Sequence, residues 1–283
     1  MLAQDIHSQS GQEKVFDTGL ALRQAVREGR FSGDTAGKAP GLLQGNLAIL
    51  PKALAHDFLL FCQRNPKPCP IIGIGEAGEV SLPDLGQDID IRTDVPAYRI
   101  FRPGQAPERV DDLNSVWRDD LVTFVLGCSF SFEEALVAAE IPVRHIDAGR
   151  NVPMYVTSIE TRPAGAFSGP LVVSMRSFSP ADAIQAILLS SRQPLAHGAP
   201  VHIGDPAQIG IRDIMSPDFG DQPIMNDRDI PVFWACGVTP QMAIRNCDAD
   251  LAITHDPGHM LVTDIPAETA ESRLWGIAQN NNN

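Results

Sequence analysis

The same strand–turn–helix pattern occurs twice in this chain, around two cysteines that are far apart in the sequence. Leu121–Val125 runs into Gly127-Cys128-Ser129, and Pro231–Trp234 runs into Ala235-Cys236-Gly237. Each apolar run is short enough for a buried strand, and each turn opens a predicted helix whose first backbone N–H groups lack helical partners. Two such helix starts brought together would form a receptor for a small anion, such as a carboxylate. The alternative is two ordinary strand-to-helix turns of an α/β sheet.

The residues of these two turns are the first candidate site residues. The backbone N–H groups of Ser129 and Gly237, together with the Thr239 hydroxyl, are predicted to bind the substrate. Thr239 precedes a proline and is predicted to cap the second helix. Cys128 and Cys236 are candidate nucleophiles, because a helix N-terminus lowers the pKa of a thiol. The alternative role for each cysteine is that of a small buried hydrophobic residue.

Strands that alternate with helices predict an α/β fold with a three-layer, mostly parallel sheet and ligands at the carboxyl ends of the strands. The pattern changes to strand–strand–helix–strand between residues 148 and 205. We therefore predict an inserted, smaller α+β subdomain at 148–205, and a discontinuous main α/β domain made of 1–147 and 206–283. Besides the two helices that begin near Ser131 and Thr239, the predicted helices are 17–29, 51–64, 179–191 and 267–276. The predicted strands are 71–74, 98–101, 121–125, 143–146, 154–161, 170–175, 200–203, 231–234, 251–254 and 260–263.

The charge and the cysteines restrict the partners and the compartment. The formal net charge of −13 argues against general binding of nucleic acid or an anionic membrane, and no apolar run is long enough to span a membrane. The five cysteines form no C-x-x-C pair, which favours a reducing cytoplasm over a disulfide framework. We expect a small anionic substrate as the partner, and a homo-oligomer is left open.

A second group of polar residues follows the strand at 251–254. His255 and His259 flank a Pro-Gly pair that excludes the helical H-x-x-x-H metal arrangement. We predict that one histidine is a general acid or base and the other a hydrogen-bonded wall of the site. Two surface histidines without a role are the alternative. A hard-cation site formed by Asp205 and Asp256 with one histidine is a weaker hypothesis. No cofactor is therefore required, and manganese or magnesium is left open.

The loop that leads into the predicted insert carries donors suited to a carboxylate. Arg150, Asn151 and Tyr155 offer a guanidinium, an amide and a hydroxyl within six consecutive residues. The alternative is a hinge loop whose arginine pairs with a nearby acid. Because the chain leaves the insert at 197–205, the entrance and exit loops should lie together, and we predict a ligand cleft between the two domains.

Seven longer motifs resemble one known family. They extend over about residues 30–266, nearly the whole chain, and comprise Thr35-Ala36-Gly37 with Gln44-Gly45-Asn46, Arg64-Asn65-Pro66-Lys67-Pro68-Cys69-Pro70, Trp117-Arg118-Asp119-Asp120, Gly127-Cys128-Ser129-Phe130, Gly149-Arg150-Asn151-Val152-Pro153-Met154-Tyr155, Pro231 to Pro240 and Thr254 to Met260. The set resembles the bacterial "putative hydro-lyase" family, which is similar to D-glutamate cyclase. The resemblance implies a two-part α/β fold with an inserted α+β domain, a cytoplasmic location and a carbon–oxygen lyase.

The resemblance also suggests a reaction, the cyclisation of glutamate to the lactam 5-oxoproline. His255 or His259 would then act first as base and afterwards as acid, and the helix-start N–H groups would stabilise the oxyanion. Arg150 with Asn151 would hold the α-carboxylate. Two alternatives remain open at this point, a non-catalytic carboxylate or amino-acid binding module and a metal-dependent lactam hydrolase or lyase.

Overall fold

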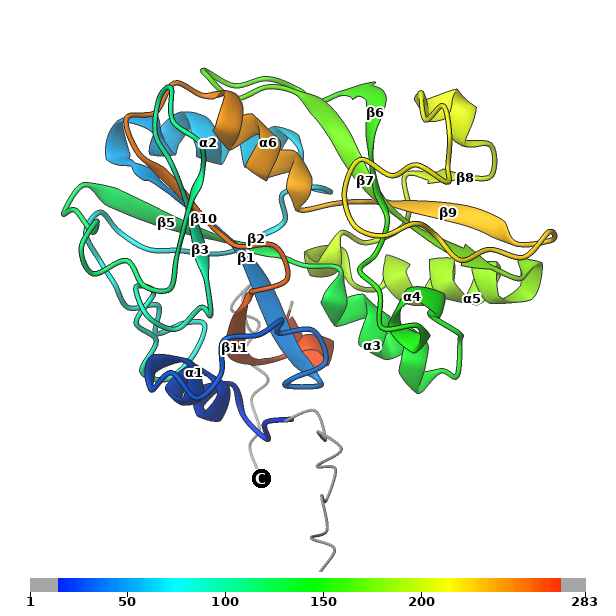
Figure 1. Cartoon of the computed structure of the whole chain (residues 1–283), viewed down its shortest axis with the longest axis horizontal. Helices are drawn as coiled ribbons and strands as arrows, with labels where there is room; N and C mark the ends of the chain where they lie inside the picture. The colour runs from blue at the N-terminus through cyan, green and yellow to red at the C-terminus, as the bar shows by residue number, and fades with distance from the viewer. Residues whose placement is uncertain (1–14, 271–283) are drawn as a thin grey trace, which may run out of the picture.

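The structure, a computed structural model, describes residues 15–270 and contains two β-sheets joined by helices (Figure 1). All strand pairs in both sheets are antiparallel. The mixed α/β character agrees with the sequence-based prediction. The prediction of a mostly parallel sheet is wrong.

The larger sheet has the strand order β2-β5-β1-β10-β3-β4, and β11 also pairs with β1. Its central strand, β1, pairs with β5 along one side, whereas β11 and β10 share its other side. Buried apolar residues cover both faces of this sheet. Its strands are β1 (Leu42–Pro51), β2 (Ile71–Ile74), β3 (Tyr98–Phe101), β4 (Glu108–Val110), β5 (Leu121–Gly127), β10 (Ala252–His255) and β11 (Leu261–Pro266).

The smaller sheet has the order β6-β7-β9-β8. It consists of β6 (Met154–Glu160), β7 (Pro170–Phe178), β8 (His202–Ile203) and β9 (Ile230–Ala235). The strands predicted within 148–205 therefore share a sheet with β9. This sheet extends past residue 205, where we expected the inserted subdomain to end.

The antiparallel pairing has a simple topological cause. β1 and β2 are linked by helix α2 (Lys52–Arg64) and run in the same direction, but β5 lies between them. β7 and β8 are linked by helix α5 (Pro180–Ser191) and also run in the same direction, with β9 between them. The helical connections thus join parallel strands, as the sequence suggested, but a later strand separates each pair. The separating strands, β5 and β9, are the two that end in cysteine turns.

The helix after each cysteine turn carries the chain to the other sheet. After β5, helix α3 (Phe130–Ala138) packs into the core of the smaller sheet with α5. After β9, helix α6 (Val238–Asn246) packs against the larger sheet and α2. Figure 1 shows α3 beside the smaller sheet and α6 over the larger one. This exchange places both helix starts at the junction of the sheets.

Most predicted elements form, with three differences. The strand predicted at 143–146 is wrong, because this segment forms the short helix α4 (Arg144–Asp147), in which His145 reaches Glu133. Strands β1 and β4 have no counterparts among the predicted elements. The predicted helix 267–276 begins with the 3₁₀ turn Ala267–Thr269, and its part beyond 270 lies outside the described residues.

The remaining helices are peripheral. Helix α1 (Gly19–Arg27) packs on β11 and is capped by the Thr18 hydroxyl, which accepts a hydrogen bond from the Ala21 N–H at 3.1 Å. Two further 3₁₀ turns are η1 (Pro194–Ala196) and η2 (Pro206–Ile209). Within residues 15–270, none of the helices has the length and apolar character that crossing a bilayer requires.

Candidate functional site

The two cysteine turns meet at the junction of the sheets, where both contact the side chain of Asn46 from β1. The Asn46 Nδ2 donates a hydrogen bond to the Gly127 carbonyl at 2.9 Å. A Cβ atom added at Gly237 would lie only 2.7 Å from the same Nδ2 atom. The turns at Cys128 and Cys236 are therefore neighbours, although more than a hundred residues separate them.

Each turn provides an unpaired backbone N–H at a helix start. Ser129 immediately precedes α3, and Gly237 immediately precedes α6. The next N–H groups, those of Phe130 and Val238, donate to the sulfur atoms of the preceding cysteines. Among residues 15–270, no protein group accepts the N–H of Ser129 or Gly237. The junction thus offers two N–H donors and the positive ends of two helix dipoles, the combination that binds anions.

Both cysteines at the turns are buried thiols. Burial raises the pKa of Cys128 to about 12, and the nearby Cys236 adds to the rise. Burial also raises the pKa of Cys236, whose Sγ lies 3.6 Å from the Met154 sulfur. Both thiols are therefore protonated at neutral pH, and the lowering that a helix start alone would produce is outweighed by desolvation. This environment suits a packing role better than the nucleophilic role considered from the sequence.

Arg176 on β7 lies directly beneath the first turn. Arg176 is only 3% exposed, and aromatic rings enclose its side chain. The guanidinium carbon lies 4.9 Å from the Phe132 ring centre and 5.5 Å from that of Trp234. It donates to the Ser129 hydroxyl at 3.2 Å and to the Ser174 hydroxyl at 2.6 Å. A buried cation therefore fixes the position of the turn that carries the Ser129 N–H.

Glu133 in the first turn of α3 balances this cation. The Arg176 Nε donates to a Glu133 oxygen at 2.9 Å, and the His145 Nε2 lies 3.2 Å from the same oxygen. Burial opposes ionisation of Glu133, but Arg176 and His145 outweigh it and lower its pKa to about 2. Our sequence reasoning missed Arg176, although an arginine inside the apolar run of β7 was a usable signal, because a buried charge requires a partner.

His255 ends strand β10, one residue later than the predicted strand, and is held neutral. The Leu47 N–H donates to its Nδ1 at 3.1 Å, so the neutral ring carries its proton on Nε2. This Nε2 lies 3.2 Å from the side-chain nitrogen of Gln241, which is itself a donor and does not accept the proton. Burial lowers the pKa of His255 to about 4. The ring is hydrogen-bonded to β1 and lies beside the first turns of α6, and its Nε2 carries a proton rather than the lone pair that a base needs.

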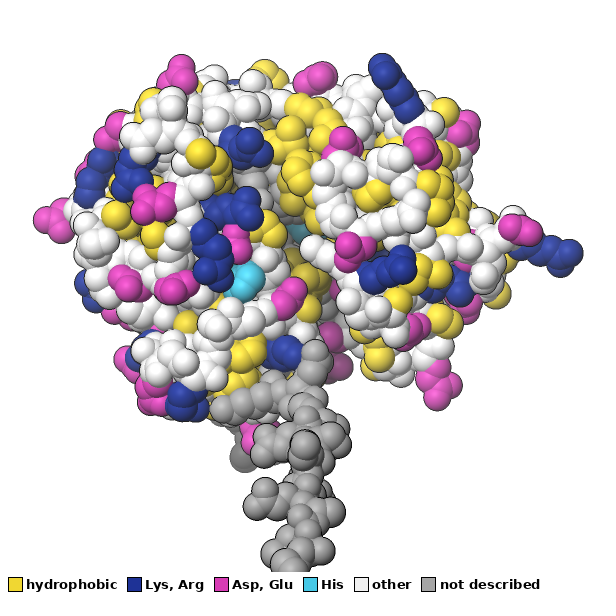
Figure 2. Space-filling model, in the orientation of Figure 1, with side chains coloured by type: hydrophobic (Ala, Val, Ile, Leu, Met, Phe, Trp, Pro, Cys, Tyr) yellow, Lys and Arg dark blue, Asp and Glu magenta, His cyan; other side chains and the backbone are white. Residues whose placement is uncertain are grey.

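His259 presents the opposite tautomer and lies beside Asp256, whose Oδ2 is 3.8 Å from its Nδ1. Its Nδ1 lies 2.8 Å from the Pro257 carbonyl, which can only accept, so the ring proton is on Nδ1 and Nε2 carries the lone pair. No described residue donates to this Nε2. The neighbouring Asp256 pairs with Arg99 and with Arg109, whose Nε lies 3.2 Å from Asp256 Oδ2. Figure 2 shows Lys and Arg side chains gathered with an acidic and a histidine side chain beside the hollow between the two halves.

Two of the loop residues predicted to hold a carboxylate, Arg150 and Asn151, donate to the 221–222 segment, Arg150 through its side chain and Asn151 through its backbone N–H. The Arg150 Nη1 lies 3.4 Å from the Gln222 carbonyl, and the Asn151 N–H donates to the Asp221 carboxylate at 2.7 Å. The loop itself does pass the second turn, because Val152 packs with Cys236. Arg150 and Asn151 are therefore near this turn along the chain, but their hydrogen bonds are made with the 221–222 segment.

Two other predicted substrate ligands make structural contacts instead. The Tyr155 hydroxyl donates to the Ile214 carbonyl, and its ring is buried in the apolar cluster of the smaller sheet. The Thr239 hydroxyl accepts from the Val172 N–H at 2.9 Å and donates to the Val172 carbonyl at 3.2 Å. Thr239 thus ties the start of α6 to β7, which holds the second turn in place.

The two aspartates of the metal hypothesis follow strands of different sheets. Asp205 follows β8 and accepts the Ala207 N–H at 3.0 Å, whereas Asp256 follows β10 and is neutralised by two arginines. Among the described residues, no three histidine, cysteine or acidic side chains cluster so that they could hold a metal ion. The donor set at the junction is instead that of an anion site.

Comparisons with known proteins match both turns and the histidine segment. The D-glutamate cyclase family model matches residues 122–264. A protein of Verminephrobacter eiseniae named "Putative hydro-lyase" is 60% identical over 253 residues, covering 89% of this chain and 92% of its own length. Proteins of the same description from Methylobacterium radiotolerans and Bordetella petrii are 56% and 58% identical, over 90% and 88% of this chain and 94% of each relative.

Proposed function

This chain belongs to the bacterial hydro-lyase family that the D-glutamate cyclase model describes, and from this premise we propose that it closes D-glutamate to 5-oxoproline with loss of water. The observation that carries the proposal is the pair of unpaired N–H groups at Ser129 and Gly237. An acyl substitution needs such donors where negative charge develops on oxygen.

The reaction balances without a co-reactant. The substrate ammonium loses a proton to a base, and the amine nitrogen attacks the γ-carboxyl carbon to form the C–N bond. The tetrahedral intermediate carries its charge on oxygen, where the two helix-start N–H groups would stabilise it; each such donor is typically worth a factor of about 10²–10³ in rate. One γ-oxygen then leaves as water, taking both protons that the nitrogen releases.

We assign the base to His259, because no described residue donates to its Nε2 and its ring lies beside the Asp256 carboxylate that orients Arg99 and Arg109. The same nitrogen can return the proton to the departing oxygen. His255 is assigned a positioning role, since its Nδ1 is occupied by the Leu47 N–H and protonation would break that bond. This division replaces the two interchangeable histidines of the sequence-based hypothesis.

The α-carboxylate is assigned to Arg99 and Arg109 rather than to Arg150 with Asn151. Both guanidinium groups are about half exposed and are oriented by Asp256, three residues before His259. Each retains N–H donors beyond those given to Asp256, and an oriented guanidinium binds a carboxylate with charge-assisted hydrogen bonds. We also propose a cytoplasmic location, which the five free thiols support.

The test is 5-oxoproline formation from D-glutamate by the wild type and by His259→Ala. Loss of a general base should slow turnover by about 10²–10⁴-fold. His56→Ala is the matched control, because His56 is exposed on α2 and lies outside the site. Equal rates for His259→Ala and wild type would remove His259 from the mechanism, and no turnover by wild type would remove D-glutamate as the substrate.

A further inference from the structure

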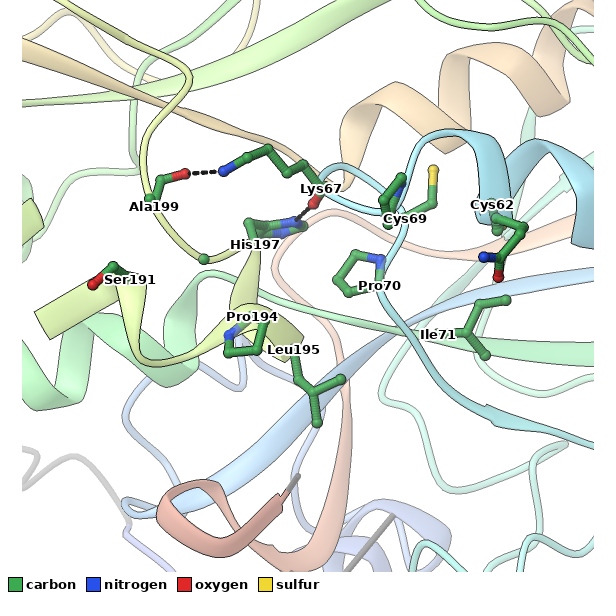
Figure 3. A pocket seen from close by; sticks show the side chains of 13 residues that line it. Cys62, Lys67, Cys69, Pro70, Ile71, Ser191, Pro194, Leu195, His197 and Ala199 are labelled. Carbon is green, nitrogen blue, oxygen red and sulfur yellow. Dashed lines mark hydrogen bonds between the residues drawn. The ribbon is translucent and has the colours of Figure 1, made fainter. Parts of the chain in front are cut away.

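A second cavity, of about 560 Å³, lies behind the first cysteine turn and outside the site described above (Figure 3). Gly127 separates the two. Its N–H donates to the Pro70 carbonyl at 2.8 Å, and a Cβ added to it would lie 1.6 Å from the Leu195 carbonyl oxygen. Because Pro70 and Leu195 both line the cavity, its wall is the back of the Cys128 turn.

His197 contributes an unused acceptor to this cavity. Its Nδ1 lies 2.7 Å from the Lys67 carbonyl, so the ring proton is on Nδ1 and Nε2 carries the lone pair. The residue is only 1% exposed, yet no described residue donates to Nε2. Nε2 has no partner among the described residues and is not fully enclosed by protein atoms. This edge of the ring therefore opens to the cavity that His197 lines. Burial lowers the pKa of His197 to about 4, which keeps the ring neutral.

The backbone at this position is unusual. His197 has φ of 74°, in the left-handed region that residues with side chains rarely adopt, and Gly198 follows with φ of 66°. The Lys67 carbonyl and the preceding η1 turn hold the ring in this conformation. Strained residues of this kind concentrate at ligand sites, where the surrounding structure fixes them.

Lys67 contributes a cation on the same side of the cavity. Its Nζ donates to the Ala199 carbonyl at 2.5 Å, which uses one of its three N–H bonds. The opposite walls are apolar and include Ile71, Pro194 and Leu195. Figure 3 shows Lys67 and His197 above these three residues. The cavity therefore combines the Lys67 cation, the neutral His197 acceptor and an apolar wall, with the polar side chains of Gln63 and Ser191 also in its lining.

We propose that this cavity binds an N-acylated apolar amino acid. The carboxylate of the ligand pairs with the Lys67 ammonium, its amide N–H donates to the His197 Nε2, and its side chain packs on Pro194 and Leu195. A free amino acid fits less well, because its own ammonium would lie near Lys67. The proposal rests on the cavity alone and stands whether or not the chain cyclises glutamate.

The experiment is calorimetric titration of the full chain with N-acetylleucine. Two analogues act as controls on the wild type, the C-terminal amide, which lacks the carboxylate, and the N-methylated acid, which lacks the N–H. Lys67→Met removes the cation, and His197→Asn removes the acceptor while keeping a residue that tolerates the left-handed backbone. Lys52→Met, on α2 outside the cavity, is the matched lysine control.

We expect saturable binding of N-acetylleucine that weakens about tenfold or more in each analogue, in Lys67→Met and in His197→Asn. Lys52→Met should bind like the wild type, and Lys67→Met should not discriminate the acid from its amide. The absence of saturable binding by the wild type would overturn the proposal. Equal affinities of Lys67→Met and Lys52→Met would also overturn it. Because the readout is binding, failure of the proposed cyclisation leaves this test unaffected.

Discussion

Replacing Glu133 with glutamine tests whether a buried ion pair fixes the first cysteine turn. The carboxylate has a pKa of about 2 against an ordinary value of 4.5, because Arg176 and His145 stabilise its charged form. At about 1.4 kcal/mol for each pH unit, this shift corresponds to about 3 kcal/mol of stability at neutral pH. Glu133→Gln leaves the buried Arg176 charge without its partner, and such losses typically cost about 3–5 kcal/mol.

The sign of the pH dependence follows from the depressed pKa. Stability from Glu133 is fully present above the unfolded pKa of 4.5 and is lost as the pH falls toward about 2. Between pH 7 and pH 3 the wild type should lose about 2 kcal/mol through this group, and Glu133→Gln should lose none of it. Other acids titrate in both proteins, so the difference between the two isolates Glu133.

The assay is urea denaturation at a series of pH values for the wild type, Glu133→Gln, Arg176→Met and the double variant. Removing both charges leaves no buried unpaired ion, so the double variant should be more stable than the sum of the single losses predicts. Additive losses, or the same pH dependence in wild type and Glu133→Gln, would refute the reasoning.

Three further predictions concern the junction. Gly237→Ala places a Cβ 2.7–3.0 Å from Asn46 side-chain atoms and should lower kcat about 10²–10³-fold by displacing one N–H donor. Gly33→Ala, whose Cβ would meet only Phe31 at 3.7 Å, should leave kcat unchanged, and steady-state rates of both variants test this. A buried histidine with a pKa of about 4 costs the wild type about 3 kcal/mol of stability as the pH falls from 6.5 to 4. His255→Asn keeps an acceptor for the Leu47 N–H and should not show this loss. The same pH dependence of denaturation in wild type and His255→Asn would contradict the prediction. A chelator should leave the cyclisation rate unchanged, since Asp256 is engaged by two arginines, and restoration of a lost rate by manganese or magnesium would show otherwise.

The central strand β1 shows why part of the fold was not predictable. Its Gln44 and Asn46 interrupt the apolar pattern of a buried strand, and Gly45 lies between them. Both polar side chains are nevertheless buried, because Thr35 accepts from Gln44 and Gly127 accepts from Asn46. These partners come from other parts of the chain, so no local pattern reveals that the burial is permitted.

The candidate site was only partly predictable from the sequence, for the same reason. The two turns, their N–H groups and the histidine segment lie within short stretches of sequence and were identified there. Arg176 and Glu133 are 43 residues apart and contact each other only after β7 and α3 have packed. Our choice of Arg150 for the carboxylate rested on its position along the chain, whereas Arg99 and Arg109 lie beside His259 only through the pairing of β3 with β4 and β10.

The sequence by itself determined the helices, most of the strands and the two helix starts with free N–H groups, because helix hydrogen bonds and turn chemistry depend on residues only a few positions apart. The tertiary structure decided the direction of strand pairing, the meeting of the turns at Asn46 and the burial of the Arg176–Glu133 pair. Side chains alternate along a strand in the same way whether its neighbour runs parallel or antiparallel, so the alternation cannot specify which strand is inserted between two others.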